Sequence, residues 1–189
     1  MSIWFGADFH FGHENVIKYS RRPFDNVDDM DECMISLWCS KVQRGDTVYF
    51  IGDFSFHNAG RTSSILSRLP GNKILIKGNH DHSKQLKKTH GWAMVRDYYE
   101  LKHAGETIVL SHYAFEVWNK HHHGSYHLHG HSHGSLPPKG ARMDVGIDCK
   151  WIGFDEGLIS FDRVCEMLKQ RKPHVVDHHN RKRRIDESD

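Results

Sequence analysis

Two histidines in one turn are the feature of this sequence that most directly suggests chemistry. His131 and His133 belong to the run Gly-His-Ser-His at residues 130–133, which follows alternating apolar and polar residues at 126–129. The alternation indicates a short strand and the glycine a sharp turn at its end, where both imidazoles can converge on a pair of metal ions. Because the chain contains 18 histidines, this spacing alone does not separate a metal site from ordinary surface histidines.

Four earlier turns supply further ligands, and each turn follows an apolar run. In chain order, the candidates at these turns are Asp8 with His10, Asp53, Asn79, and His112. Ligands gathered at strand ends are expected for an open α/β sheet, whose binding crevice lies outside the carboxyl ends of its strands. With the two histidines of the last turn, the set has seven members.

Seven mixed nitrogen and oxygen ligands exceed what one tetrahedral ion accepts, and they lack the thiolates of structural zinc sites. They suit two divalent ions that share a carboxylate. We expect Mn²⁺ first; Fe²⁺, Ni²⁺ or Zn²⁺ also accept imidazole with carboxylate, whereas Mg²⁺ and Ca²⁺ prefer oxygen ligands. Two such ions generate hydroxide near neutral pH and hold the attacking and leaving oxygens of an in-line displacement at phosphorus. The ligand set therefore predicts phosphoryl chemistry.

The two residues after Asn79 are the candidate catalytic pair. With the Asn79 oxygen on a metal, His80 would be free to donate a proton to the leaving alkoxide, as a general acid. We expect Asp81 to fix the orientation of His80 and to favour its protonated form. The alternative is that His80 only packs beside the site.

Two residues near the first turn are candidates for substrate binding. His13 could contact the substrate or cap the next helix, and Arg22 could clamp phosphate oxygens with its forked guanidinium or be solvated. The three consecutive histidines at residues 121–123 could line the substrate cleft or lie on the surface.

The elements that position these residues alternate in the first half of the chain. Asn26 can cap a helix with apolar residues at helical spacing from Met30 to Val42, and Ser160 can cap a last helix. Shorter helices are predicted at residues 63–69 and 83–89, and strands at residues 2–7, 47–51, 73–76, 95–102, 107–111, 126–129 and 143–147. This order predicts an α/β fold in which a two-sheet β-sandwich is flanked by α-helices.

Length and composition indicate one domain at residues 1–172 and a polar tail at residues 173–189. The tail buries too little apolar area to offset its ordering entropy, so we expect disorder, and its basic patch could be solvated or touch nucleic acid. The formal charge of +2 implies no steering of the whole molecule toward nucleic acid. With no apolar run near 18 residues, no export signal and no paired cysteine pattern, we expect a cytoplasmic protein with reduced thiols and no membrane partner.

The ordered ligand blocks resemble those of the calcineurin-like metallophosphoesterases. The matching blocks are Asp8-x-His10, Gly52-Asp53, Gly78-Asn79-His80-Asp81, His112 and Gly130-His131-x-His133. The chain also resembles a small bacterial and phage branch that lacks a cap domain, although Ala114 stands where that branch often has proline.

The resemblance implies a two-sheet sandwich flanked by helices and a dinuclear centre in which Asp53 bridges the metals. It assigns one metal to Asp8, His10, Asp53 and His133, and the other to Asp53, Asn79, His112 and His131. It also makes His80 the counterpart of the family's catalytic histidine.

We therefore expect a dinuclear phosphoesterase that works by in-line attack of a metal-bridging hydroxide. Since no inserted segment is long enough for a lid, phosphodiesters are favoured, with nucleotides or nucleic acid as candidate substrates. The alternatives are a phosphomonoesterase of the same fold, or a nucleic-acid-binding or metal-binding protein without turnover. A metallo-β-lactamase type of hydrolase would need a clustered HxHxDH motif near the start, which is not present.

Overall fold

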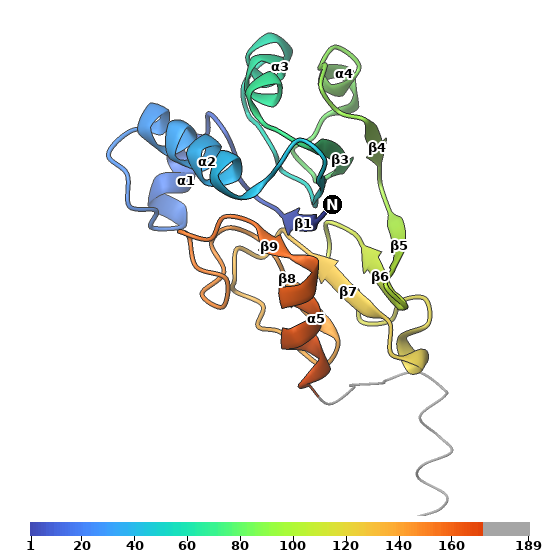
Figure 1. Ribbon diagram of the computed structural model, residues 1–189. Coiled ribbons are helices and arrows are strands. Elements are labelled where there is room, and N and C mark those ends of the chain that lie inside the picture. The colour runs from blue at the N-terminus through green and yellow to red at the C-terminus, as the bar shows by residue number, and fades with distance from the viewer. Residues whose placement is uncertain (172–189) are drawn as a thin grey trace, which may run out of the picture.

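The computed structural model describes residues 1–171 of the chain, shown in Figure 1. The tail predicted at residues 173–189 lies outside the described residues, as does residue 172. The strands are β1 (Ile3–Gly6), β2 (Thr47–Phe50), β3 (Asn72–Ile76), β4 (Met94–Arg96), β5 (Tyr99–His103), β6 (Glu106–Leu110), β7 (Tyr126–His129), β8 (Arg142–Asp144) and β9 (Ile159–Ser160). The helices are α1 (Glu14–Tyr19), α2 (Val27–Lys41), α3 (Ala59–Arg68), α4 (Ser83–Leu86), α5 (Phe161–Lys169) and the 3₁₀ helix η1 (His121–His123).

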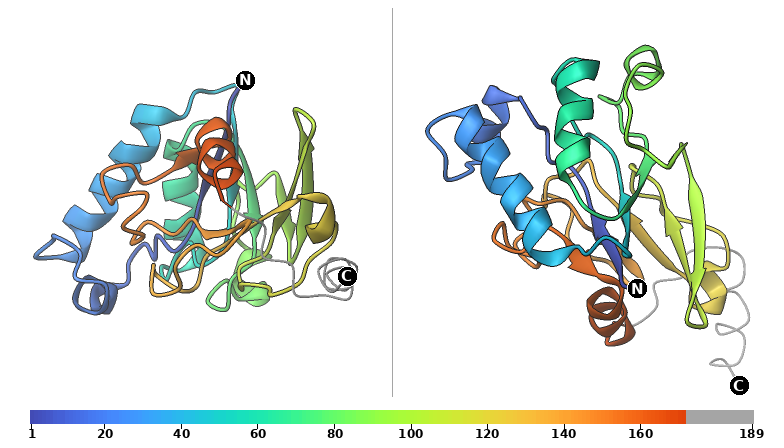
Figure 2. Two further views of the ribbon diagram at one scale, coloured as in Figure 1. Left: turned by 90° about the horizontal axis from the view of Figure 1, so that it is seen from below. Right: turned by 45° about the horizontal axis from the view of Figure 1, so that its top comes forward.

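The first sheet has the order β4-β3-β2-β1-β9, in which β1 to β4 run parallel and β9 runs antiparallel. Its central strands are apolar on both faces, as expected for a sheet covered on both sides. In β2, Val48 and Phe50 pack on the core beneath α2 and α3, whereas Tyr49 packs on the core shared with the second sheet. Figures 1 and 2 show α2 and α3 on one side of this sheet and β5 to β8 on the other.

The second sheet has the order β5-β6-β7-β8. Its side chains Ile108, Leu128 and Met143 are buried in one core with Phe5 and Ile74 of the first sheet. Two mixed sheets packed face to face, with helices outside, confirm the predicted fold class.

Helix caps form as the sequence predicts. The Asn26 Oδ1 accepts the Asp29 N–H at 2.9 Å at the start of α2, and the Ser160 Oγ accepts the Arg163 N–H at 3.3 Å at the start of α5. Each bond satisfies a backbone donor that has no partner within the helix.

The prediction of one strand at residues 95–102 is wrong, because the segment forms two strands that belong to different sheets. Met94–Arg96 pairs with β3 in the first sheet, and the chain then crosses so that Tyr99 pairs with Leu110 in the second. Both parts are extended and partly apolar, so local sequence carries no signal for the change of sheet. β5 then turns into β6 through Ala104 and Gly105, both with positive φ (48° and 83°), the geometry of a tight hairpin.

The two sheets meet at the edge where β1, β2, β3, β6 and β7 end. A bridge joins Ala7 to Gly146, and the His112 Nδ1, after β6, donates to the Ile51 carbonyl, after β2, at 2.9 Å. The turns after these strands are therefore brought to one place. None of the helices within residues 1–171 has the length and apolar character needed to cross a membrane.

Candidate metal centre

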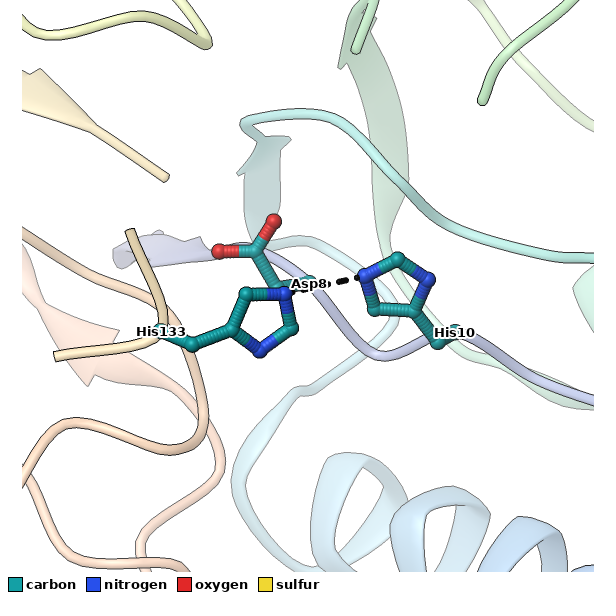
Figure 3. A group of neighbouring side chains, drawn as sticks. All are labelled: Asp8, His10 and His133. Carbon is teal, nitrogen blue, oxygen red and sulfur yellow. Dashed lines mark hydrogen bonds between the residues drawn. The ribbon is translucent and has the colours of Figure 1, made fainter. Parts of the chain in front are cut away.

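Six of the predicted ligands lie in two tight groups at this edge. One group is Asp8, His10 and His133, and the other is Asp53, His112 and His131. In each group the ligand atoms all lie within 4.8 Å of one another. The groups combine turns that are far apart in the sequence, and Figure 3 shows the two histidines of the first group facing each other beside the Asp8 carboxylate.

Backbone strain is concentrated in these turns. Eight described residues other than glycine have positive φ, and five of them are predicted ligands: Asp8 (61°), His10 (55°), Asp53 (56°), His131 (67°) and His133 (46°). A left-handed conformation costs a residue with a Cβ about 1–2 kcal/mol, so it persists only where the surrounding structure imposes it. Strain of this kind is typical of functional sites.

Two glycines allow the turns to approach so closely. At Gly52, which has a φ of 86°, a Cβ would lie 2.3 Å from the His112 Nδ1. At Gly78 a Cβ would lie 2.2 Å from the Asp53 Oδ1. Any side chain at either position would displace a predicted ligand.

In the first group, the His10 Nε2 lies 3.2 Å from the His133 Nε2, as Figure 3 shows. The other ring nitrogen of His133, Nδ1, lies 2.6 Å from the Asp148 Oδ2, to which it can donate a hydrogen bond. A neutral His133 protonated on Nδ1 presents an unprotonated Nε2, which is the form that binds a metal.

In the second group, the His112 Nδ1 donates to the Ile51 carbonyl at 2.9 Å, so Nε2 is the ring nitrogen that faces the other predicted ligands. The Asn79 Oδ1, the seventh predicted ligand, lies 3.1 Å from this Nε2 and 3.0 Å from the His131 Nδ1. A metal ion among these three atoms would replace these hydrogen bonds with coordination.

Asp53 lies between the two groups. Its Oδ2 is 3.5 Å from the His112 Nε2 and 3.7 Å from the His10 Nε2, while its Oδ1 accepts the His80 N–H at 2.9 Å. One carboxylate therefore faces both groups, in the position that a shared ligand needs.

The protonation states of the side chains at the site favour the binding of cations. Burial raises the pKa of Asp8 to about 7, because its ionised carboxylate has lost its water. Burial also lowers the pKa of His10 to about 3, so this imidazole stays neutral. Burial raises the pKa of Asp53, but hydrogen bonding and charge from His112 outweigh it and leave the pKa at about 2. Carboxylates and imidazoles held this close fit two divalent ions of the type that accepts nitrogen and oxygen together.

The predicted pairing of Asp81 with His80 is corrected by the structure. The buried Asp81 carboxylate accepts the backbone N–H groups of Asp53 at 2.7 Å, Gly78 at 2.8 Å and Phe54 at 3.2 Å. In residues 1–171 no hydrogen bond joins it to His80. Asp81 therefore ties together the turns after β2 and β3, since a carboxylate is the side chain that can satisfy several buried donors at once.

The His80 ring lies at the mouth of the site. Its side chain is 41% exposed, and its Nε2 lies 4.0 Å from the Asp53 Oδ2. It borders the His10 ring, with 5.7 Å between centroids. This position beside both groups leaves the imidazole open to a bound molecule.

The predicted phosphate contact of Arg22 is also corrected. The guanidinium is buried, forks onto the Asp148 carboxylate with two bonds of 2.9 Å, and donates to the carbonyls of Asp8 at 2.6 Å and Phe9 at 2.7 Å. All of these hydrogen-bond partners belong to the protein, so Arg22 holds the first turn in place and is not available to a phosphate.

His13 precedes α1 without a side-chain cap bond, and its ring centroid lies 5.5 Å from that of His10, beside the site.

Asp148 is the important residue that the sequence reasoning missed. Its carboxylate accepts hydrogen bonds from Arg22 and His133. Burial raises the pKa of this carboxyl, but the two hydrogen-bond partners and the charge of Arg22 outweigh burial and hold the pKa at about 2. Asp148 directly follows the strand predicted at residues 143–147, so the strand-end rule applied to the other predicted ligands could have found it.

The three consecutive histidines form η1, which lies before β7 and so away from the turn that follows β7. The His121 ring stacks on Trp118, with 3.7 Å between ring centroids.

Comparison with known proteins places this chain among small proteins of similar length. No family model matches it. It is 27% identical to the uncharacterized protein MJ1445 of Methanocaldococcus jannaschii over 179 residues, which cover 90% of this chain and 93% of that protein. It is 29% identical to the Gene 66 protein of Mycobacterium phage D29 over 201 residues, covering 88% and 96% of the two chains.

One solved structure of unknown function shares the fold over most of this chain. AQ665, a protein of unknown function from Aquifex aeolicus, superimposes with a TM-score of 0.68 at 25% identity, covering 88% of this chain and 98% of that one. YfcE, a phosphoesterase from E. coli, is a more distant likeness, with a TM-score of 0.46 and 14% identity over 77% and 78% of the chains. The archaeal, phage and Aquifex proteins are each matched over almost their whole length.

Proposed function

We propose that this protein is a metal-dependent phosphoesterase that favours phosphodiesters. The observation that supports the proposal best is the pair of ligand groups with Asp53 between them. Asp8, His10, Asp53 and His133 would hold one divalent ion, and Asp53, Asn79, His112 and His131 the other, with Mn²⁺ the ion to test first. When bound, two such ions activate water and neutralise charge at phosphorus.

His80 is the proposed proton donor to the leaving oxygen. Its exposed ring lies at the mouth of the site, and its backbone N–H is fixed by the Asp53 carboxylate. Because Asp81 contacts backbone instead, the orientation of His80 depends on the turn that carries it. A cavity of about 390 Å³ beside Asn79 and His112 supports the preference for diesters, because it leaves room for a second substituent on phosphorus.

The proposal is tested by comparing a bis-aryl phosphodiester with an aryl monophosphate at several Mn²⁺ concentrations. We expect metal-dependent hydrolysis of both, with a higher kcat/KM for the diester. A higher value for the monoester would indicate a phosphomonoesterase. Failure to hydrolyse any phosphoester, combined with oligonucleotide binding, would favour a binding protein without turnover.

The role of His80 is tested by His80→Ala. General acid catalysis contributes roughly 10²- to 10⁴-fold, so we expect a loss of that size in kcat for diesters with poor leaving groups and a much smaller loss for aryl leaving groups. Both metal ions should remain bound, as measured by elemental analysis. His90→Ala, at an exposed histidine beyond α4, is the matched control. Equal losses on good and poor leaving groups would contradict the role.

A further inference from the structure

One exposed aromatic side chain lies among the histidines of the candidate site. Of the ten phenylalanines, all within the described residues, six are buried and three are half-buried, whereas Phe56 is 41% exposed. Its ring stacks on His13, with 4.0 Å between centroids and 15° between planes, and lies 4.6 Å from His80 and 5.4 Å from His10. It borders the first ligand group.

The backbone on either side of Phe56 is firmly held. The Phe56 N–H donates to the Phe11 carbonyl at 2.8 Å, and the His57 N–H donates to the Ser55 Oγ at 3.1 Å. The His57 Nε2 lies 2.7 Å from the Asp31 Oδ2. The ring is therefore presented to solvent by an ordered loop, so the protein would lose little conformational entropy when a ligand covered the ring.

A second exposed aromatic ring borders the other ligand group. Tyr113 is 49% exposed, and its ring centroid lies 4.7 Å from that of His131 and 5.3 Å from that of His112. It also lines the cavity of about 390 Å³ beside Asn79. Each ligand group thus has one exposed aromatic ring against it.

This clustering is not a general property of the surface. Six large apolar side chains are exposed in the described residues, and three of them, Tyr19, Phe56 and Tyr113, contact histidines of the site or of its border. Exposed apolar groups gathered around a polar centre mark a place where a ligand covers them. The ligand must combine flat apolar groups with a group that divalent metals bind.

We propose that Phe56 and Tyr113 are substrate-positioning residues that stack on the two nucleobases flanking the scissile phosphate of a single-stranded oligonucleotide. The inference rests on the proposed phosphodiesterase function and narrows its substrate class. A nucleobase offers the flat face that stacks on an aromatic ring, and such stacking is tolerant of base identity. Sugar phosphates and other diesters without rings would leave both aromatic side chains uncovered.

The test measures kcat and KM for a thymidine dinucleotide and for the same phosphodiester between two abasic deoxyriboses, with Mn²⁺ present. In Phe56→Ala and in Tyr113→Ala we expect the KM of the dinucleotide to rise roughly 5- to 150-fold, the range of one base stacked on an aromatic ring. The abasic diester should keep its kcat and KM, which would not hold if the substitutions disturbed His80 or the ligands. Phe56→Trp and Tyr113→Phe should restore the KM of the dinucleotide.

Tyr98→Ala is the matched control, because Tyr98 is 40% exposed but contacts Glu100 and Phe115 instead of a predicted ligand. An equal rise in KM in this variant would overturn the inference, as would an unchanged KM in either Phe56→Ala or Tyr113→Ala. Hydrolysis of the dinucleotide by the unaltered protein would still support the proposed function in each of those cases.

Binding is measured separately, by calorimetry with a phosphorothioate dinucleotide and Mn²⁺, so that the inference does not depend on turnover. Weaker binding in both alanine variants but not in Tyr98→Ala supports it, and equal affinity or no binding overturns it. If the unaltered protein hydrolyses no phosphodiester, the proposed function fails and with it the substrate role of the two rings, and calorimetry then decides only whether Phe56 and Tyr113 bind nucleobases.

Discussion

The two ligand groups of the candidate centre differ in what surrounds them. The first group is backed by a buried ion pair, since Asp148 binds both the His133 ring and the Arg22 guanidinium. The second group is held mainly by backbone, through the Ile51 carbonyl on His112, and its His131 is exposed.

This difference indicates that the two groups depend on the rest of the protein in different ways. Buried charges hold the first group rigidly, so a change there should affect folding and metal binding together. The second group opens on the cavity lined by Asn79 and Tyr113, so a change at the exposed Asn79 or His131 should affect metal and substrate with little effect on folding. The predictions below test that separation.

Asp53→Ala should have the largest effect, because Asp53 faces both groups. We expect loss of metal from both and a fall in turnover beyond the roughly 10²- to 10⁴-fold assigned to a general acid. Elemental analysis and diester hydrolysis measure the two losses. Glu32→Ala, an exposed carboxylate paired with Arg68 on the helical face, should change neither. Retention of one tightly bound ion would show that Asp53 is not shared.

Asp148→Asn should affect the first group selectively. Removing one partner of a buried ion pair costs about 3–5 kcal/mol of unfolding free energy, which urea denaturation of the metal-free protein would show. Loss of the support behind His133 should also weaken metal affinity about 10- to 100-fold in one of two binding steps. Asn79→Ala should instead weaken the other step and leave the metal-free stability nearly unchanged. If both variants weaken the same step, the two groups are not separate sites.

Metal removal should destabilise the protein more at high pH. Burial lowers the pKa of His112, but hydrogen bonding to Asp53 and the charges of Asp8 and Asp53 outweigh it and raise the pKa to about 9. A raised histidine pKa stabilises the fold below about pH 6.5, and that contribution, up to about 3 kcal/mol, is lost as pH rises to 9. Metal binding strengthens over the same window because its ligands must be deprotonated.

The difference in Tm between Mn²⁺-loaded and EDTA-treated protein should therefore grow from pH 6.5 to pH 9. Calorimetric melting at both pH values measures it. In His112→Ala the metal-free Tm should vary less over this window. A difference that shrank with rising pH would contradict the assignment of His112 as a metal ligand.

Ser20→Ala should have the smallest effect. The Ser20 Oγ lies 3.2 Å from the same His133 Nδ1 that Asp148 contacts, but it carries no charge. A neutral hydrogen bond contributes about 0.5–1.5 kcal/mol, so stability and metal affinity should fall far less than in Asp148→Asn. Comparable losses in the two variants would mean that the charge of Asp148 is not what supports the first group.

Much of the fold and the ligand positions could be predicted because both follow from short-range patterns. Apolar runs mark strands, and each predicted ligand turn begins two or three residues beyond a strand: Asp8 after β1, Asp53 after β2, Asn79 after β3, His112 after β6 and His131 after β7. Parallel strands end at the same edge, so these residues could be expected to converge.

At the candidate site, the errors concern which groups a side chain contacts rather than where the residue lies. Arg22 and Asp81 were predicted to face the substrate and its proton donor, but one binds Asp148, 126 residues away, and the other binds backbone of the turn after β2. A charged side chain pairs with whatever the fold brings within a few ångströms, and no local pattern encodes that.

The sequence by itself determined which residues stand at the strand ends and that the two sheets are apolar enough to pack together, because strand periodicity and turn chemistry act over a few residues. Only the tertiary structure decided which of the predicted ligand atoms come within 4.8 Å of one another, that Arg22 and Asp148 support the first group, and that Phe56 and Tyr113 remain exposed beside the site. These features depend on how the turns approach one another across the sandwich, and distances between segments far apart along the chain are set by packing of the whole core.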